Sequence, residues 1–93
     1  MKVVYSKESL EELYNVTDFY KKIDTEIVRN FKIEIKKVES TLEKSPEIYK
    51  IRYKLFRRVN LKNYPFCIFF KIDKSNIKIV KIIHQSRDPV FWL

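Results

Sequence analysis

The run PFCIFFKIDKSNIKIVKII, residues 65–83, decides the fold of this chain. Residues 66–72 form an apolar stretch directly after a proline, and residues 73–76 (Asp-Lys-Ser-Asn) have the composition of a tight turn. Residues 77–83 are apolar on both faces apart from two lysines, which places this strand in the middle of a sheet. The run therefore predicts two antiparallel strands joined by a short hairpin.

Upstream of the hairpin, residues 51–59 alternate between apolar and mostly basic side chains. This period of two predicts one further strand whose inward face carries Ile51, Tyr53, Leu55 and Val59. Arg57 falls on the same face, where an unpaired guanidinium is very costly and needs a partner or an exit to solvent. Either a structural salt bridge or a functional site would explain it, and periodicity alone slightly favours the structural interpretation.

The first half of the chain predicts a short strand and a helical hairpin. Residues 3–5 form the strand, and a helix follows over about 7–21, with Ser6 or Ser9 as its cap. A longer helix begins at the cap Asp24 and ends before Pro46. Both helices carry apolar stripes that we assign to the core: Leu10, Leu13, Val16, Phe19, Tyr20 and Ile23, then Ile27, Phe31, Ile35, Val38 and Leu42.

These elements define one α+β domain over residues 1–93, in the order β-α-α-β-β-β. The helical hairpin packs on one face of a small, mainly antiparallel sheet. Asp88 as cap and Pro89 at the first helical position predict a short C-terminal helical turn.

The amino-acid composition excludes several kinds of functional site. The absence of glycine excludes Gly-rich phosphate loops. One cysteine, Cys67, and one histidine, His84, argue against a zinc site, so we expect neither a metal nor a cofactor. Cys67 lies in an apolar run and is interpreted as a buried hydrophobe. Without a signal peptide or an apolar span of membrane length, we expect a cytoplasmic protein that binds no membrane.

The net positive charge is concentrated in the second half of the chain. Residues 1–45 carry nine Lys/Arg and nine Asp/Glu, whereas residues 46–93 carry eleven Lys/Arg and three acids, so all of the +8 net charge lies there. Such a field attracts phosphate backbones or an acidic protein, although a solvated lysine-rich surface is equally consistent. Within this half, Arg52, Lys54 and Arg58 flank Phe56 as a basic stripe, typical of a nucleic-acid interface or of a solvated outer sheet face.

Two motifs resemble RelE/ParE toxins, the plasmid stabilisation proteins of type II toxin–antitoxin systems. FRRVNLKNYPFCIFFKI at 56–72 is similar to the family's V-R-R…F-P-Y-x-I-x-Y-x-V segment. HQSRDP at 84–89, followed by Trp92, is similar to its H-x-x-R-D-P-x-x-W ending. The resemblance implies a growth-inhibiting toxin with a cognate antitoxin that wraps it. One branch cleaves messenger RNA on the ribosome, and the other inhibits DNA gyrase without known catalysis.

The resemblance also implies site residues. In an RNA-cleaving enzyme, an endoribonuclease (mRNA interferase), His84 would move a proton while Arg57 and Arg87 hold the phosphate charge. The nucleic acid or protein partner would then contact Arg52, Lys54, Arg58, Lys81 and Trp92. RNA-cleaving relatives often carry a tyrosine near the C-terminus where Phe91-Trp92 stands here, which weakens the nuclease interpretation. In a gyrase inhibitor, His84 and Arg87 would shape the end of the sheet. A non-toxic basic protein- or nucleic-acid-binding module on the same fold is the third hypothesis.

Overall fold

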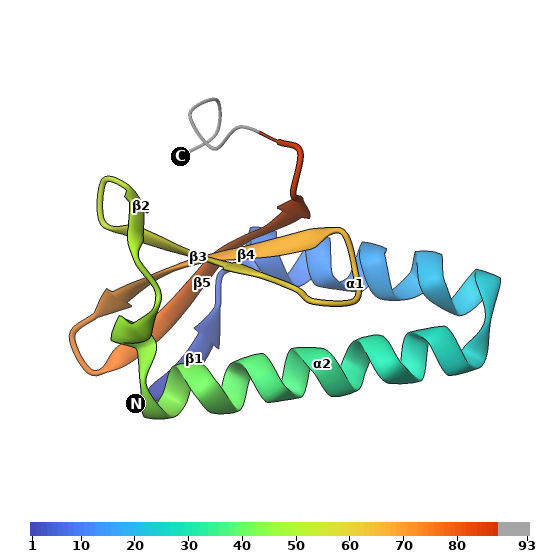
Figure 1. The fold of residues 1–93 in the computed structure, drawn as a ribbon, viewed down its shortest axis with the longest axis horizontal. Helices are drawn as coiled ribbons and strands as arrows, with labels where there is room; N and C mark the ends of the chain where they lie inside the picture. The colour runs from blue at the N-terminus through green and yellow to red at the C-terminus, as the bar shows by residue number, and fades with distance from the viewer. Residues whose placement is uncertain (88–93) are drawn as a thin grey trace.

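A computed structural model describes residues 1–87 and begins with strand β1, Lys2–Tyr5 (Figure 1). Helix α1, Lys7–Ile23, follows, and Ser6 caps it by accepting the Ser9 N–H on its hydroxyl at 3.1 Å. Asp24 ends α1 and caps helix α2, Thr25–Lys44, by accepting the Glu26 N–H at 2.7 Å. Of the two predicted caps of α1, Ser6 is therefore the one used.

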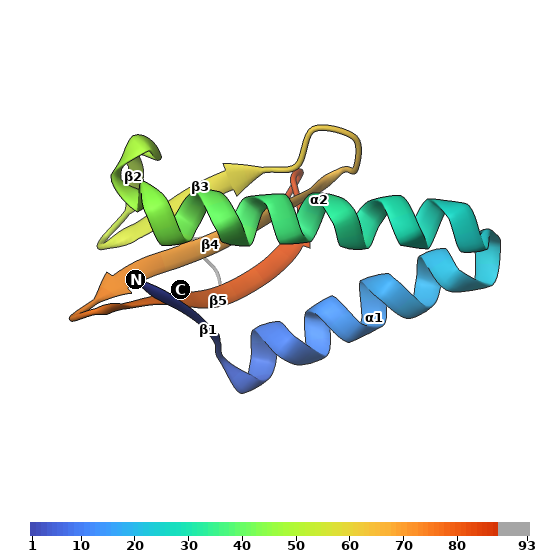
Figure 2. The same cartoon turned by 90° about the horizontal axis from the view of Figure 1, so that it is seen from below.

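The second half begins with a short 3₁₀ turn, η1 (Pro46–Ile48), and continues as four strands. These are β2 (Ile51–Tyr53), β3 (Phe56–Asn60), β4 (Phe66–Asp73) and β5 (Asn76–His84). The sheet has the order β1-β5-β4-β3-β2, with β1 parallel to β5 and every other pair antiparallel. Both helices lie on the same face of this sheet (Figure 2). The predicted α+β class is confirmed, and the predicted C-terminal helical turn lies outside the described residues.

The single strand predicted over residues 51–59 is wrong, because the chain turns back at Lys54. This residue has φ 51°, in the left-handed region, and the two segments on either side pair as β2 and β3. Ile51 and Leu55, assigned to the core, are 51% and 72% exposed. A two-residue turn preserves the alternation of side chains, so the period of two runs through it, and no Gly, Asn or Pro marks the break.

The main core lies between the helices and the sheet. The α2 stripe is confirmed: Phe31, Ile35 and Leu42 are buried, and Ile27 and Val38 pack against them. The α1 stripe is only partly right, because Val16 and Tyr20 are buried and Leu13 packs against the core, whereas three of its members are more than half exposed: Leu10, Phe19 and Ile23. A helix lying on a sheet buries a narrow arc, and these three residues flank that arc on both sides.

A second, smaller cluster lies on the other face of the sheet, where Cys67, Phe69 and Ile83 are buried. Cys67 is fully buried, which confirms its assignment as a small hydrophobe, and burial raises the pKa of its thiol. The pairing Phe69↔Lys81 and Phe70↔Ile79 leaves Val80 as an extra residue, a bulge in β5. No helix within residues 1–87 is long and apolar enough to cross a membrane.

Candidate functional site

The motif residues His84 and Arg87 come together in one tight turn at the end of β5. The Arg87 N–H donates to the His84 carbonyl at 3.0 Å. The Ser86 N–H donates to Nδ1 of His84 at 3.2 Å, and the Ser86 hydroxyl oxygen lies 2.8 Å from the same nitrogen. The ring packs against the edge of Phe66, with centroids 5.8 Å apart. Both motif side chains are exposed.

Arg57 does not join this turn. It lies opposite Phe70 on β4, whereas His84 lies opposite Phe66, four residues away along the same strand. Four residues span about 13 Å, and β3 and β5 flank β4 on either side, which adds two strand spacings of about 4.8 Å each. The backbones of Arg57 and His84 are therefore about 16 Å apart. Arg57 instead donates from Nη1 to the Tyr49 carbonyl at 2.7 Å, which gives its half-buried guanidinium a structural partner.

The predicted basic stripe is not one surface along one strand. Arg52 lies in β2 and Lys54 in the turn, with the Lys54 ammonium 5.2 Å from the centroid of the Tyr53 ring. Arg58 lies in β3 on the opposite sheet face to Arg57, with its guanidinium 5.6 Å from the Phe69 centroid. It donates to the Gln85 carbonyl at 3.0 Å and to Asn60 Oδ1 at 2.8 Å. Arg58 thus ties β3 to the chain after β5. Trp92 lies outside the described residues.

Gln85 is a site residue that the sequence reasoning missed. Its side-chain amide donates to the carbonyls of Leu61, Tyr64 and Phe66 at 3.2, 3.3 and 3.0 Å, and its backbone N–H donates to the Pro65 carbonyl at 2.8 Å. These bonds hold the β3–β4 loop from the side of the motif turn. The only sequence signal was its place between His84 and Arg87, because no periodicity links residue 85 to residues 61–66.

The same loop is held from the other side by Glu34 of α2. Its carboxylate accepts the backbone N–H of Lys62 at 2.6 Å and both the backbone and side-chain N–H groups of Asn63. Hydrogen bonds to Glu34 and to Gln85 therefore hold the β3–β4 loop between α2 and the motif turn.

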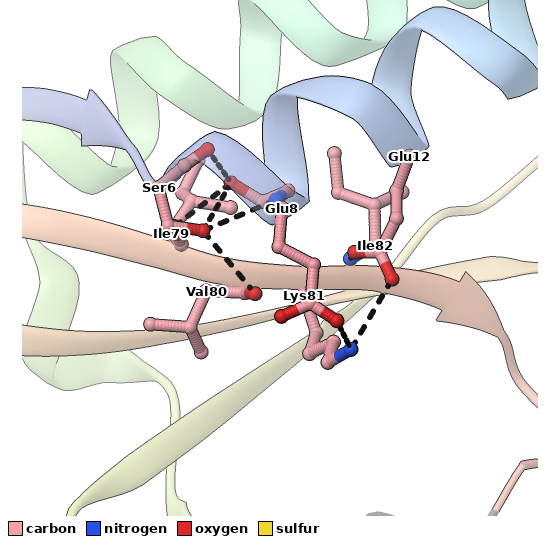
Figure 3. A network of polar contacts seen from close by, with 8 residues as sticks. Ser6, Glu8, Glu12, Ile79, Val80, Lys81 and Ile82 are labelled. Carbon is pink, nitrogen blue, oxygen red and sulfur yellow. Dashed lines mark hydrogen bonds and ion pairs between the residues drawn. The ribbon is translucent and has the colours of Figure 1, made fainter. Parts of the chain in front are cut away.

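Lys81, predicted to contact a partner, is almost fully buried beside α1 (Figure 3). Its ammonium donates to Glu8 and, at 3.4 Å, to Glu12 Oε2. Burial by itself lowers the pKa of Lys81, but the hydrogen bond to Glu8 and the charge of Glu12 outweigh it and raise this pKa above its ordinary value. Lys81 lies opposite Phe69, which belongs to the cluster on the sheet face away from the helices, and Glu8 and Glu12 of α1 extend to its ammonium.

Comparison with known proteins identifies the family. Residues 3–89 match the family model described as ParE toxin of type II toxin-antitoxin system, parDE. The chain belongs to the ParE toxin family. A solved structure, "Chromosomal ParDE TA system from P. aeruginosa", superposes with a TM-score of 0.77 at 18% identity, covering 90% of this chain and 95% of that one. At this identity the superposition shows the fold alone. No curated protein matches.

This ParE-family chain is thus the toxin component of a type II toxin–antitoxin system. The match extends from within β1 through both helices and strands β2 to β5, well beyond the two motifs. Within the toxin, His84, Gln85 and Arg87 form one turn at one end of the sheet, while Arg57 lies toward the other end.

Proposed function

We propose that this toxin arrests growth by binding DNA gyrase, without chemistry of its own, and that a cognate antitoxin holds it inactive. The observation that carries the proposal is the separation of about 16 Å between the backbones of Arg57 and His84, derived from their register on β4. The family match to ParE toxins supports the same conclusion.

The chemistry of RNA cleavage explains why this separation matters. The 2′-hydroxyl must lose a proton, the leaving 5′-oxygen must gain one, and the phosphate must be stabilised, all around one phosphorus atom. Donors to that phosphate must lie within about 3 Å of its oxygens. Arg57 donates to the Tyr49 carbonyl instead, so in this arrangement the side chains of Arg57 and His84 do not converge on one phosphate site. His84 and Arg87 fit better as residues that shape the end of the sheet.

A supercoiling assay tests the proposal directly. Purified toxin is expected to inhibit gyrase, and His84→Gln, which keeps a polar side chain but removes the titratable ring, is expected to inhibit it equally. The same samples are added to a translation extract, where messenger RNA should stay intact. Intact supercoiling together with His84-dependent cleavage of messenger RNA would instead establish a ribosome-dependent ribonuclease.

Induction in bacteria lacking the antitoxin gives the cellular counterpart. Labelled-precursor incorporation is expected to fall first for DNA and only later for protein. A fall in protein synthesis first would contradict the gyrase proposal and make His84 and Arg87 catalytic candidates. Unchanged growth would favour the third hypothesis, a basic binding module that has lost toxicity.

A further inference from the structure

Four lysines gather at one end of the sheet, around the turn that joins β4 to β5. Lys71 and Lys78 lie directly opposite each other on these two strands, and Lys74 lies in the turn. Lys2 of β1 lies opposite Asn76, where β5 begins. Lys2 and Lys74 are exposed, and Lys71 and Lys78 are half-buried. We call these four residues the lysine patch.

The strand residues of the patch lie on the sheet face away from the helices. Successive side chains of a strand point to opposite faces, and Ile77 and Ile79 are buried in the main core, so Lys78 between them points away from it. Phe70 is buried in the same core, which places Lys71 beside Lys78. Figure 2 shows both helices on the other face of the sheet. No helix within residues 1–87 therefore covers the patch.

The charge of the patch is not neutralised by the part of the chain that the structure describes. No carboxylate of residues 1–87 lies within ion-pair distance of these four ammonium groups. Asp73 is the acid of the same stretch, and together with the four lysines it leaves a net charge of +3. Lys81 on the same strand is different, because Glu8 and Glu12 both contact its ammonium.

The pair Lys71–Lys78 lowers the stability of the toxin on its own. Side chains directly opposite on antiparallel strands have Cβ atoms about 5 Å apart, and like charges at such positions are destabilising. On its other side Lys78 lies opposite Val4 of β1, which offers no charge to offset the repulsion. An anion between the two ammonium groups would remove this cost. The arrangement therefore favours an anionic ligand over a purely structural role.

The surroundings of the patch favour a nucleic-acid duplex among anionic ligands. Hot spots of protein interfaces are apolar or aromatic, whereas none of the exposed large hydrophobic side chains of residues 1–87 lies on β4 or β5. A single strand binds through aromatic side chains that stack on its bases, and the exposed aromatic residues within 1–87, Tyr14 and Phe19, lie on α1. Lysine is a point charge that meets phosphates without reading bases.

We propose that the lysine patch binds the phosphate backbone of duplex DNA without base specificity. The DNA contact is inferred from the patch itself, and its use during growth arrest, on the DNA that gyrase holds, rests on the proposed function. The patch spans three neighbouring strands, β1, β5 and β4, which is about 10 Å. Each DNA strand carries a phosphate about every 3.4 Å of helix axis, so the patch faces about three successive phosphates.

Salt dependence of DNA binding tests the contact in the absence of gyrase. Fluorescence anisotropy of a short labelled duplex is recorded over a series of salt concentrations. Four phosphate contacts predict a slope of about −3.6 for the logarithm of the association constant against that of salt concentration. Lys78→Gln is expected to make this slope shallower by about 1 and to weaken binding roughly tenfold at about 50 mM salt.

The matched control removes a lysine from the other side of the sheet. Lys36 is exposed and belongs to a separate cluster of cations on α2, and it forms no ion pair within residues 1–87. Lys36→Gln should change the affinity for the duplex less than about twofold. Equal losses in Lys78→Gln and Lys36→Gln would overturn the proposal, because they would reflect net charge alone. Absence of duplex binding at low salt would overturn it as well.

A charge reversal separates DNA binding from folding. Lys71→Glu turns the like-charge pair into a cross-strand ion pair, so this variant should unfold at a higher temperature than the unmodified toxin. It should nevertheless bind the duplex more weakly, by roughly tenfold or more at low salt, and more weakly than Lys36→Glu. Higher thermal stability with unchanged DNA affinity would show a purely structural pair and would overturn the proposal.

Competition experiments identify the class of ligand. Unlabelled duplex DNA should displace the labelled duplex, while single-stranded RNA and polyglutamate at matched charge concentration should displace it poorly. Stronger competition by RNA or by polyglutamate, abolished in Lys78→Gln, would assign the patch to that ligand and overturn the duplex proposal.

Supercoiling assays keep this proposal distinguishable from the gyrase proposal. Lys78→Gln should inhibit gyrase only at a severalfold higher concentration than the unmodified toxin, and Lys36→Gln at the same concentration. If no sample inhibits gyrase but duplex binding depends on Lys78, the gyrase proposal fails and the DNA site stands. If the toxin inhibits gyrase while its DNA affinity is independent of Lys71 and Lys78, the DNA site fails and the gyrase proposal stands.

Discussion

Glu12 accepts the backbone N–H of Ile82 at 2.9 Å, just beyond the point where β1 stops covering the edge of β5. Strand β1 pairs with β5 only as far as Tyr5 opposite Ile79. The Ser9 hydroxyl donates to the Ile79 carbonyl at 3.0 Å, and the Ser6 hydroxyl donates to the Val80 carbonyl at 3.4 Å (Figure 3). Side chains at the start of α1 therefore supply hydrogen bonds where β1 ends. A buried backbone polar group without a partner costs about 1–3 kcal/mol, which explains why an acid accepts the Ile82 N–H and serines donate to the neighbouring carbonyls.

Removing Glu12 should therefore destabilise the fold. Glu12→Ala leaves the Ile82 N–H unpartnered and takes one of two carboxylates from the buried Lys81 ammonium, so we expect a loss of about 2–3 kcal/mol in the free energy of unfolding. Urea denaturation measures it. Glu11→Ala, at the neighbouring exposed position, is the control and should stay within about 0.5 kcal/mol. Equal losses of unfolding free energy in both variants would show that the hydrogen bonds of Glu12 add nothing to stability.

The ion pair of Lys81 should make stability depend on alkaline pH. Its folded pKa lies above the ordinary value of 10.5, so its contribution is fully present below 10.5 and is lost as the pH rises through the higher folded pKa. The difference in unfolding free energy between the toxin and Lys81→Met should stay constant from pH 7 to about 9 and narrow above 10.5. Urea titrations at a series of pH values measure this difference. A gap that widens at alkaline pH would contradict the assigned direction of the shift.

Gln85 should control the order of the β3–β4 loop. Gln85→Ala removes the donors that meet two loop carbonyls and the first carbonyl of β4, with an expected cost of about 2 kcal/mol. Gln85→Glu should cost more at neutral pH, because it places carboxylate oxygens against those carbonyls. Hydrogen exchange of residues 61–66 should accelerate in both variants and not in Ser86→Ala. Unchanged exchange in Gln85→Ala would show that Glu34 alone holds the loop.

Lys71 and Lys78 lie directly opposite each other on β4 and β5, a like-charge pair that costs stability. Lys71→Glu should stabilise the toxin by about 0.5 kcal/mol through a cross-strand ion pair. Lys78→Glu should do the same, and the double variant should lose both gains because it restores repulsion. Thermal unfolding of the four proteins forms a complete double-mutant cycle. Additive effects in that cycle would show that the two side chains do not interact across the strands.

The sequence was informative where one local pattern controls a whole element. The α2 stripe, the 66–72 and 77–83 strands and their turn were all predicted, because burial on one face or both imposes its own period on the chain. It misled at residues 51–59, since a two-residue hairpin keeps the same alternation as a continuous strand. It also could not show that Leu10 and Phe19 would flank the buried arc of α1, because that depends on how the helix rolls on the sheet.

The sequence by itself determined the family, the fold class and the positive charge, because these depend on residue order and composition. The tertiary structure decided which of the candidate residues meet. Strand register placed Arg57 about 16 Å from His84, and the fold brought Glu8 and Glu12 of α1 to the buried Lys81 ammonium. Contacts of this kind join residues far apart in the chain, and no local period encodes them.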